Sequence, residues 1–377
     1  MIFTLALRNL FHDRIRLAVT LIGILFSIVL VAVQLGMYLG SSQIITAHIE
    51  HADADLFITT NGAKSFEDGG GFLLTERERH QALATEGVRS VVPLFVNFSD
   101  WQKPGGGFAR VVIVGANFED RGLVPWALTD GTLDDIKTPD AVAVDKSYLD
   151  ELGISGIGDS AQAAYGRVKI RALTQGVRSF TRAPYVYTTL SKARQLFNAP
   201  ADHTTFFLVK VAPGADVERV KTAIASRLES AEVLTKDEFK KRSLKQWLFG
   251  TGAGFALIGG ALLGSLVGTV IVAQTLYSST KDHIHEFATL RALGSSAGYI
   301  HKVILTQAGL SAVIGYTLGM IISLIILYLS KGSALPLVMT PALAFWLFAL
   351  TTAMCVISAL SAIVKVTKID PATVFSR

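Results

Sequence analysis

The sequence predicts an α-helical membrane protein with four transmembrane helices and a large α+β extracytoplasmic domain inserted between helices 1 and 2. Only 17% of its 377 residues are Asp, Glu, Lys or Arg, well below the roughly 25% of a soluble globular chain. A segment of 206 residues, from Gly40 to Lys245, has ordinary polar composition and the length of one large domain. The charges are absent from Leu17–Ile49, Gln246–Thr280, Val303–Ser330 and Gly332–Val364.

Each of the four uncharged stretches is long enough to cross a bilayer, whose hydrocarbon core takes about 20 helical residues. We expect spans at residues 17–39, 247–277, 303–330 and 342–364, with a short extracytoplasmic loop of residues 331–341 between the last two. The first two stretches, of 33 and 35 residues, exceed the bilayer thickness. The first and second helices are therefore expected to continue outward as stalks.

The short flanking segments predict the orientation, because Lys and Arg concentrate in cytoplasmic loops. Residues 1–16, 278–302 and 365–377 each carry three of them, whereas the 331–341 loop carries one lysine. Both termini and the 278–302 loop are therefore predicted to be cytoplasmic. The net charge of +5 partly reflects this bias, and no basic cluster with interleaved aromatic residues indicates nucleic-acid binding.

The inserted domain, residues 40–246, is predicted to mix strands and helices. The run Phe206–Val211, followed by a Pro-Gly turn and Asp216, is typical of a strand, a turn and a helix with Asp216 as N-cap. The charged run Lys236–Lys245 is expected to be helical and to lead straight into the second span. Strands are predicted at 56–59, 90–96, 110–114, 141–144, 168–173, 185–188 and 206–211, and helices at 75–84, 146–152, 191–198 and 216–230.

Small residues recur at four-residue spacing in the second and third spans and predict close helix packing. A face of this kind lets another helix backbone approach, either within the chain or in a second copy, and the spacing does not choose between them. The residues are Ala256, Gly260, Gly264 and Gly268 in the second span and Gly315 and Gly319 in the third.

No motif of nucleotide-binding or acyl-transfer chemistry is present in the sequence. The glycines Gly254 and Gly259 are not followed by the Lys and Ser or Thr of a phosphate loop, and they lie within the second span. Cys355, the only cysteine, lies in the fourth span and is expected to be a buried, inert thiol.

Two groups of histidines are weak candidates for a metal or regulatory site. His48 and His51 share a helical face and have acidic neighbours, but they lack the spacing of a zinc protease motif. We therefore favour a solvated helix end over a metal site. For His283, His285 and His301 we likewise favour a polar, membrane-proximal helix surface.

The loop between the second and third spans predicts a short amphipathic helix. Apolar side chains at Ile284, Phe287, Leu290 and Leu293 recur at helical spacing, and Gly294 is a natural stop. The pattern fits either a surface helix at the membrane or a docking helix for a cytoplasmic partner. Since the spans lack the charged relay residues of ion-coupled transporters, energy for transport would have to come from a separate subunit.

Several segments resemble FtsX-like (MacB-fold) permeases of ABC transporters. Glu286–Ser295, which reads Glu-Phe-Ala-Thr-Leu-Arg-Ala-Leu-Gly-Ser and precedes an apolar span with a Gly-x-x-x-Gly pair, resembles the family signature. Leu7–Leu10 resembles the family's amphipathic elbow helix, expected here within residues 1–16, and Ile369–Ala372 resembles its tail. The segments that resemble the DevC subgroup are Ala52–Leu56, Gly268–Ile271, Gln274–Ser278 and Lys281–Glu286.

This resemblance implies the permease of a type VII ABC transporter, in which two permeases pair and bind a separate ATPase. ATP and Mg²⁺ would bind to that ATPase, so this chain is expected to be no enzyme and to hold no cofactor. DevC-type systems work with a periplasmic adaptor (a membrane fusion protein) and an outer-membrane tunnel, and they export glycolipids or other lipophilic compounds across the bacterial inner membrane. The expected ATPase-coupling contacts are Lys281, Asp282, Glu286, Leu290, Arg291, Leu293 and Gly294.

Two alternatives stay open at the level of the sequence. An FtsX- or LolC-like mechanotransmitter would activate a periplasmic hydrolase or extract a lipoprotein without a tunnel. A membrane sensor would bind a ligand with its outer domain and have no ATPase. The co-purifying partners would distinguish the three functions.

Overall fold

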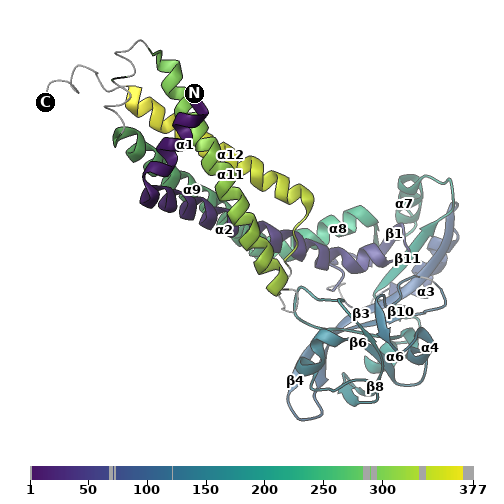
Figure 1. Cartoon of the computed structure of the whole chain (residues 1–377). Helices are drawn as coiled ribbons and strands as arrows, with labels where there is room; N and C mark the ends of the chain where they lie inside the picture. Colours follow the sequence, from purple (N-terminus) through teal and green to yellow (C-terminus); the bar gives the residue numbers. More distant parts are fainter. Residues whose placement is uncertain are drawn as a thin grey trace. The chain divides into compact units, whose positions relative to one another are not determined.

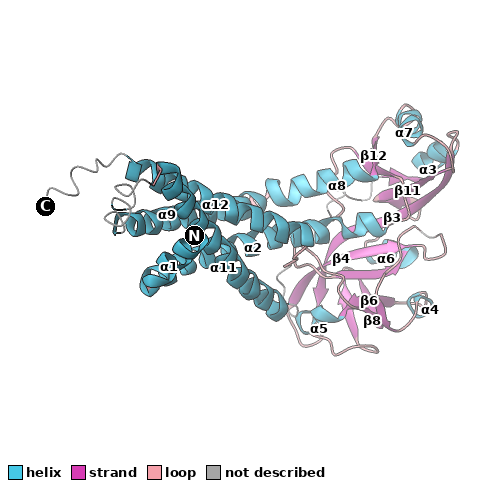
Figure 2. Ribbon diagram, turned by 45° about the horizontal axis from the view of Figure 1, so that its top comes forward, coloured by secondary structure: helices cyan, strands magenta, loops and turns pink. Residues whose placement is uncertain are grey.

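The computed structural model describes residues 2–67, 71, 74–120, 122–282, 289, 295–330 and 337–367. Residues 297 and 365–367 are described by their backbone only. The chain divides into two compact units. The helical unit comprises residues 1–41 and 254–377, and the inserted domain comprises residues 42–253. Figures 1 and 2 show the helices of the first and the strands of the second.

In the described residues, the helical unit comprises a short N-terminal helix and four long helices. Asp13 separates the first two helices, because its side chain accepts a hydrogen bond from the Arg16 backbone N–H at 3.1 Å and thereby caps the second helix. Each of the four long helices has the length and apolar composition needed to cross a membrane, which confirms the predicted number of candidate spans. The helices are α1 (Ile2–His12), α2 (Arg14–His51), α9 (Ala253–Asp282), α11 (Ala297–Ser330) and α12 (Pro341–Thr367).

The second span begins differently from the sequence prediction. The charged helix α8 (Lys236–Leu244) does not run straight into it, because a π-helical turn, η2 (Lys245–Gly250), and a bend follow. Gly252 has a φ of 82°, a left-handed conformation that favours glycine, and α9 starts at Ala253. Two glycines flank Thr251 there, and their low helix propensity explains the interruption.

A mixed β-sheet forms the centre of the inserted domain (Figure 2). The strand order is β12-β1-β11-β3-β4-β9-β6-β8-β5, and β7 pairs with β3 and β8. The pairs β4–β9 and β6–β8 are parallel and the others are antiparallel. The strands are β1 (Leu56–Thr60), β3 (Val88–Gln102), β4 (Phe108–Ala116), β5 (Leu128–Asp130), β6 (Ala141–Asp145), β7 (Ser160–Ala163), β8 (Gly166–Thr174), β9 (Tyr185–Thr189), β11 (Phe206–Val211) and β12 (Ala231–Thr235), with β2 (Leu74–Thr75) and β10 (His203–Thr204) forming a separate pair.

All seven predicted strands are confirmed, and the described residues form five further strands that the sequence pattern missed. Four of the five have only two to four residues, too few for an alternating pattern to stand out. The fifth, β12, follows a helix that ends at Ala225, five residues before the predicted end. The helices of the domain are α3 (Glu76–Leu83), α4 (Leu133–Ile136), η1 (Lys146–Tyr148), α5 (Leu149–Leu152), α6 (Leu190–Leu196) and α7 (Val217–Ala225).

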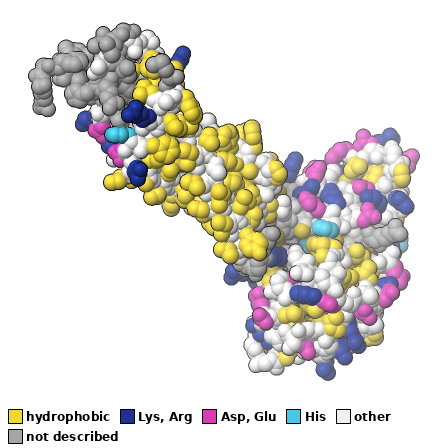
Figure 3. Space-filling view, viewed as in Figure 1, with side chains coloured by type: hydrophobic (Ala, Val, Ile, Leu, Met, Phe, Trp, Pro, Cys, Tyr) yellow, Lys and Arg dark blue, Asp and Glu magenta, His cyan; other side chains and the backbone are white. Residues whose placement is uncertain are grey.

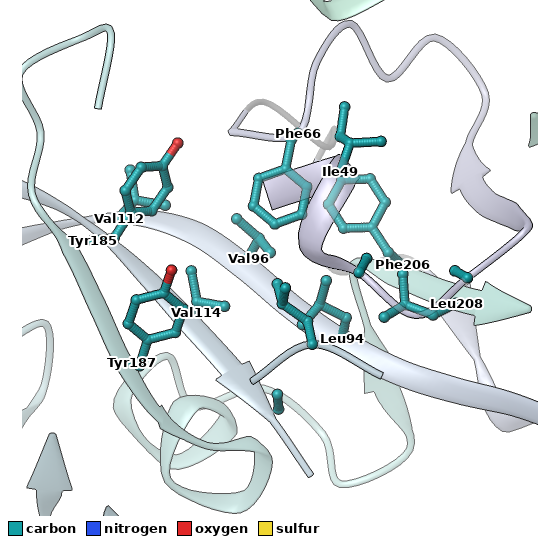
Figure 4. Packing of buried hydrophobic residues seen from close by; sticks show 14 of the residues in the cluster. Ile49, Phe66, Leu94, Val96, Val112, Val114, Tyr185, Tyr187, Phe206 and Leu208 are labelled. Carbon is teal, nitrogen blue, oxygen red and sulfur yellow. The ribbon is translucent and has the colours of Figure 1, made fainter. Parts of the chain in front are cut away.

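The two faces of the sheet pack separate hydrophobic cores. On one face, Leu94, Val96, Val112 and Val114 pack with the aromatic residues of β9 and β11 (Figure 4). Alternate residues of the same strands, such as Val111 and Ile113, belong to the core on the other face. The first core is the one that receives the end of α2, through Ile49.

Candidate functional site

Helix α2 is the element on which the small residues of the other spans pack. Gly268 of α9 lies so close that a Cβ built on it would be 2.5 Å from the Cβ of Ser27. A Cβ on Gly315 of α11 would be 2.4 Å from the Cγ2 of Ile24. Three further glycines pack on α2: Gly260 and Gly264 of α9 against Gln34 and Leu30, and Gly319 of α11 against Ile28.

This packing lies within one chain, and one predicted member does not share it. Gly260, Gly264, Gly268, Gly315 and Gly319 all face α2 of their own chain, whereas Ala256 is exposed. The sequence had left open whether these residues meet a helix of the same chain or of a second copy. In the described residues, five of the six meet the same chain.

Serine hydroxyls reinforce the contacts between the spans. Ser27 Oγ donates to the Gly264 carbonyl oxygen at 2.8 Å, and Ser358 Oγ of α12 donates to the Thr269 carbonyl oxygen at 2.9 Å. Hydroxyl groups can hydrogen-bond across helices in lipid, where water offers no competition. Cys355 of α12 is fully buried in this bundle, as the sequence predicts.

A groove of about 850 Å³ lies between α2 and α9 on the surface of the helical unit. Its walls include exposed apolar side chains such as Ile22 and Phe26. Gln274, Thr275 and Ser278 add a polar strip on α9, and Gln274 is exposed. Figure 3 shows hydrophobic side chains over much of the visible face of this unit.

The predicted coupling residues lie partly outside the described structure. Lys281 and Asp282 are the last two residues of α9. Arg16, near the start of α2, pairs with Asp282 at 2.5 Å and so ties the ends of the first two spans together. Glu286, Leu290, Arg291, Leu293 and Gly294 lie outside the described residues.

One face of the end of α2 is buried in the inserted domain, contrary to the solvated helix end that we predicted for His48. Only 1% of the His48 surface is exposed, because the ring lies among aromatic side chains. His48 Nε2 is 2.7 Å from the Tyr187 hydroxyl, and the ring centroid is 3.8 Å from that of Tyr185 and 5.0 Å from that of Phe66. His51 remains exposed and stacks on Trp126 at 4.0 Å.

A buried carboxylate lies beside this helix end. The hydroxyl groups of Tyr185, Ser179 and Thr181 donate to Glu67, the latter two at 3.0 and 3.1 Å. Burial raises the pKa of the Glu67 carboxyl, although the three hydroxyl donors partly oppose the shift. The sequence offered no signal for this group, since its partners are 112 to 118 residues away.

Lys236, the first residue of α8, caps the end of α2. Its ammonium group donates to the carbonyl oxygens of Glu50 at 2.9 Å and Ala52 at 2.8 Å. A cation at this position satisfies carbonyls that the helix leaves free and complements the helix dipole. Phe239, one turn further along α8, is fully buried and contacts Phe57 and Phe206, with ring centroids 5.1 and 5.6 Å away.

Of the two histidine groups, only His48, His51 and His301 lie in the described part of the chain. There, no three His, Cys, Asp or Glu side chains gather in a way that could hold a metal ion. His301 lies in α11 with its Nε2 buried and unpartnered, and His283 and His285 lie outside the described residues. The described arrangement offers helix packing and polar anchoring.

Comparisons with known proteins identify both units. The family described as MacB-like periplasmic core domain matches residues 17–227, more than half of the chain, and the family described as FtsX-like permease C-terminal matches residues 258–371. No curated protein matches the chain.

Three solved structures are similar to parts of the chain. The periplasmic region of MacB from Actinobacillus actinomycetemcomitans is 13% identical over 51% of this chain and 94% of that chain, with a TM-score of 0.38. The extracellular domain of the noncanonic ABC-type transporter YknZ from Gram-positive bacteria is 15% identical over 48% of this chain and 99% of that chain, with a TM-score of 0.35. A domain of a putative permease protein from Porphyromonas gingivalis is 14% identical over 49% of this chain and 91% of that chain, with a TM-score of 0.33.

Proposed function

Because this chain belongs to the ABC transporter permeases that combine a MacB-like periplasmic core domain with an FtsX-like permease domain, we propose that it is the permease subunit of an ATP-driven exporter of the DevC/MacB type. The family implies an ABC ATPase as partner. ATP and Mg²⁺ bind to that separate subunit, and this chain contributes no catalytic residue. The bacterial inner membrane holds the four spans, with both termini in the cytoplasm and the inserted domain in the periplasm.

The observation that carries the proposal is helix α2. It runs without interruption from Arg14 to His51, packs against the glycines of α9 and α11 within the helical unit, and ends in the core of the inserted domain through Ile49. Close packing of this kind transmits displacement, because tightly packed side chains leave no void to absorb it. The permease therefore acts as a mechanotransmitter, by which ATPase motion reaches the inserted domain.

Coupling to the ATPase occurs through the loop that follows α9. The coupling contacts are Lys281, Asp282, Glu286, Leu290, Arg291, Leu293 and Gly294. The pair between Arg16 and Asp282 supports this assignment, since it joins the start of the first span to the last residue of α9, where the loop begins. Motion of this loop therefore acts on α2 and α9 together.

A second copy of the chain completes the transporter as a homodimer. Gln274 supports this assembly, because an amide exposed on an apolar span lacks hydrogen-bond partners in lipid. The groove between α2 and α9 presents Gln274, Thr275 and Ser278 together, so a second copy can pair its own polar strip with this one. The substrate class is a lipophilic compound such as a glycolipid, passed to a periplasmic adaptor and an outer-membrane tunnel.

The test is co-expression of the full chain with its ATPase. The double variant Glu286→Lys with Arg291→Glu should fold and insert as wild type but lose stimulation of ATP hydrolysis. Wild-type stimulation in that variant would refute the coupling assignment. Co-purified proteins test the remainder: an ATPase with an adaptor supports the exporter, whereas an ATPase with a hydrolase or lipoprotein, or no ATPase, would overturn it.

A further inference from the structure

The loop of residues 178–182, between β8 and β9, points its side chains alternately to two different elements. Ser179 and Thr181 donate hydrogen bonds to Glu67 at 3.0 and 3.1 Å. Phe180, between them, packs its ring against Trp247 of η2, with the centroids 6.0 Å apart. The loop thus contacts the β1–β2 connection with one set of side chains and η2 with the other.

The Glu67 side of the loop leads to the end of α2. Glu67 follows Phe66, whose ring stacks on His48 of α2 at 5.0 Å. Tyr185 joins the same two elements, because its hydroxyl donates to Glu67 while its ring lies 3.8 Å from His48. Hydrogen bonds to a buried carboxylate are strong and directional, so this connection has one preferred geometry.

The Trp247 side of the loop leads to the start of the second span. Trp247 lies in η2, and α9 begins at Ala253, only six residues later. The neighbouring Leu248 is fully buried, so η2 is anchored on the inserted domain. Phe180 and Trp247 are themselves only half-buried, and an aromatic pair at this spacing adds attraction beyond its burial.

We propose that the 178–182 loop is a positioning element that clamps the end of α2 to η2. The two chain segments that lead to the first and second spans then move together, and the inserted domain follows them as one body. This inference rests on the proposed mechanotransmission and names residues for it. The clamp is formed by Glu67 and Trp247 as the two anchors and by Ser179, Phe180 and Thr181 as the connection. Without it, α2 and η2 would still fold and would stay joined through Lys236 of α8, but η2 would move more freely relative to the end of α2.

The first experiment tests the clamp without any ATPase, by hydrogen–deuterium exchange on the full chain in nanodiscs. Phe180→Ala should speed amide exchange in η2, and Trp247→Ala should speed exchange in the 178–182 loop, each about threefold to tenfold. Trp247→Phe, which keeps a ring, should restore near wild-type exchange. If either truncation changes exchange only in its own segment, the clamp does not exist.

The control is Phe197→Ala, which removes a half-buried ring from another aromatic pair of the same domain. Phe197 packs on Phe95 with the centroids 5.2 Å apart. This variant should leave exchange in η2 unchanged while lowering the unfolding temperature as much as Phe180→Ala. Faster exchange in η2 in the control would mean that general loosening, not the clamp, explains the first result.

The second experiment adds the co-expressed ATPase and ATP. In wild type, ATP should change exchange in η2 and in the 178–182 loop together. Phe180→Ala should keep stimulated ATP hydrolysis and the change in η2 but lose the change in the loop. A loop response that survives in Phe180→Ala would overturn the clamp, whereas absence of any ATPase binding would overturn the proposed function and leave the first experiment standing.

Discussion

The helical unit and the inserted domain hold their elements together by different means. In the helical unit, glycines let helix backbones approach, as where Gly268 meets Ser27. In the inserted domain, large aromatic side chains fill the core, as where Phe239 contacts Phe57 and Phe206. The difference follows from the surroundings: burial of a large apolar side chain away from water stabilises a soluble domain, whereas lipid gives no such drive and leaves close packing to hold helices together.

Polar groups follow the same division between the two units. In the helical unit, Ser27 and Ser358 donate to backbone carbonyls of a neighbouring helix. In the inserted domain, Glu67 binds three hydroxyl groups from distant parts of the sequence. Burying a lone hydroxyl in lipid costs less free energy than burying a carboxylate. A buried carboxylate requires several hydrogen-bond donors, which only the folded domain can bring together.

The largest expected effect tests the core of the inserted domain. Phe239→Ala should lower its free energy of unfolding by about 3–5 kcal/mol, because it removes a fully buried ring and leaves a cavity. Urea unfolding of the full chain in detergent, followed by tryptophan fluorescence, measures the change. Phe108→Ala, at a side chain that is 71% exposed, is the control and should change the free energy by less than about 0.5 kcal/mol. Equal losses in both variants would contradict the assigned core.

An intermediate effect is expected where α9 meets α2. Gly268→Ala should destabilise the helical unit by about 1–3 kcal/mol, since its Cβ would lie 2.5 Å from Ser27. Unfolding by sodium dodecyl sulfate, followed by circular dichroism, measures the loss. In Gly309→Ala the new Cβ meets no atom within 4 Å, so this control should be neutral or up to about 1 kcal/mol more stable. A neutral Gly268→Ala would show that α9 does not pack closely on α2.

The smallest expected effect is a pH dependence that belongs to the inserted domain. Burial raises the pKa of Glu67 above its ordinary value of 4.5, so the native state holds this proton more tightly than the unfolded state. The free energy of unfolding should therefore fall as pH rises from about 4.5 through the raised pKa, by at most about 1.4 kcal/mol per pH unit.

Glu67→Gln should remove this slope, because the amide stays neutral at every pH. Thermal unfolding of the full chain between pH 4.5 and 8 measures it, and Glu86→Gln, at an exposed carboxylate in the same domain, is the control. A slope that persists unchanged in Glu67→Gln would assign it to another group and remove Glu67 from the comparison.

Sequence reasoning succeeded where a local pattern carries the information. Uncharged runs located the four spans, and Asp216 was correctly predicted to cap its helix, where its side chain accepts from the Arg219 backbone N–H at 3.0 Å. It failed for His48, because acidic neighbours in the sequence suggested a solvated end, whereas the aromatic rings that bury it come from residues up to 139 positions away. The bend before α9 was also missed, although Gly250 and Gly252 marked it.

By itself, the sequence determined the number of spans, the place of the inserted domain and the small residues available for packing. These follow from composition and spacing, since a bilayer accepts only long uncharged helices. Only the tertiary structure decided that Gly260, Gly264 and Gly268 meet α2 of their own chain, and that Glu67 gathers Ser179, Thr181 and Tyr185. Such contacts depend on which distant segments meet in three dimensions, and the local order of residues does not encode that meeting.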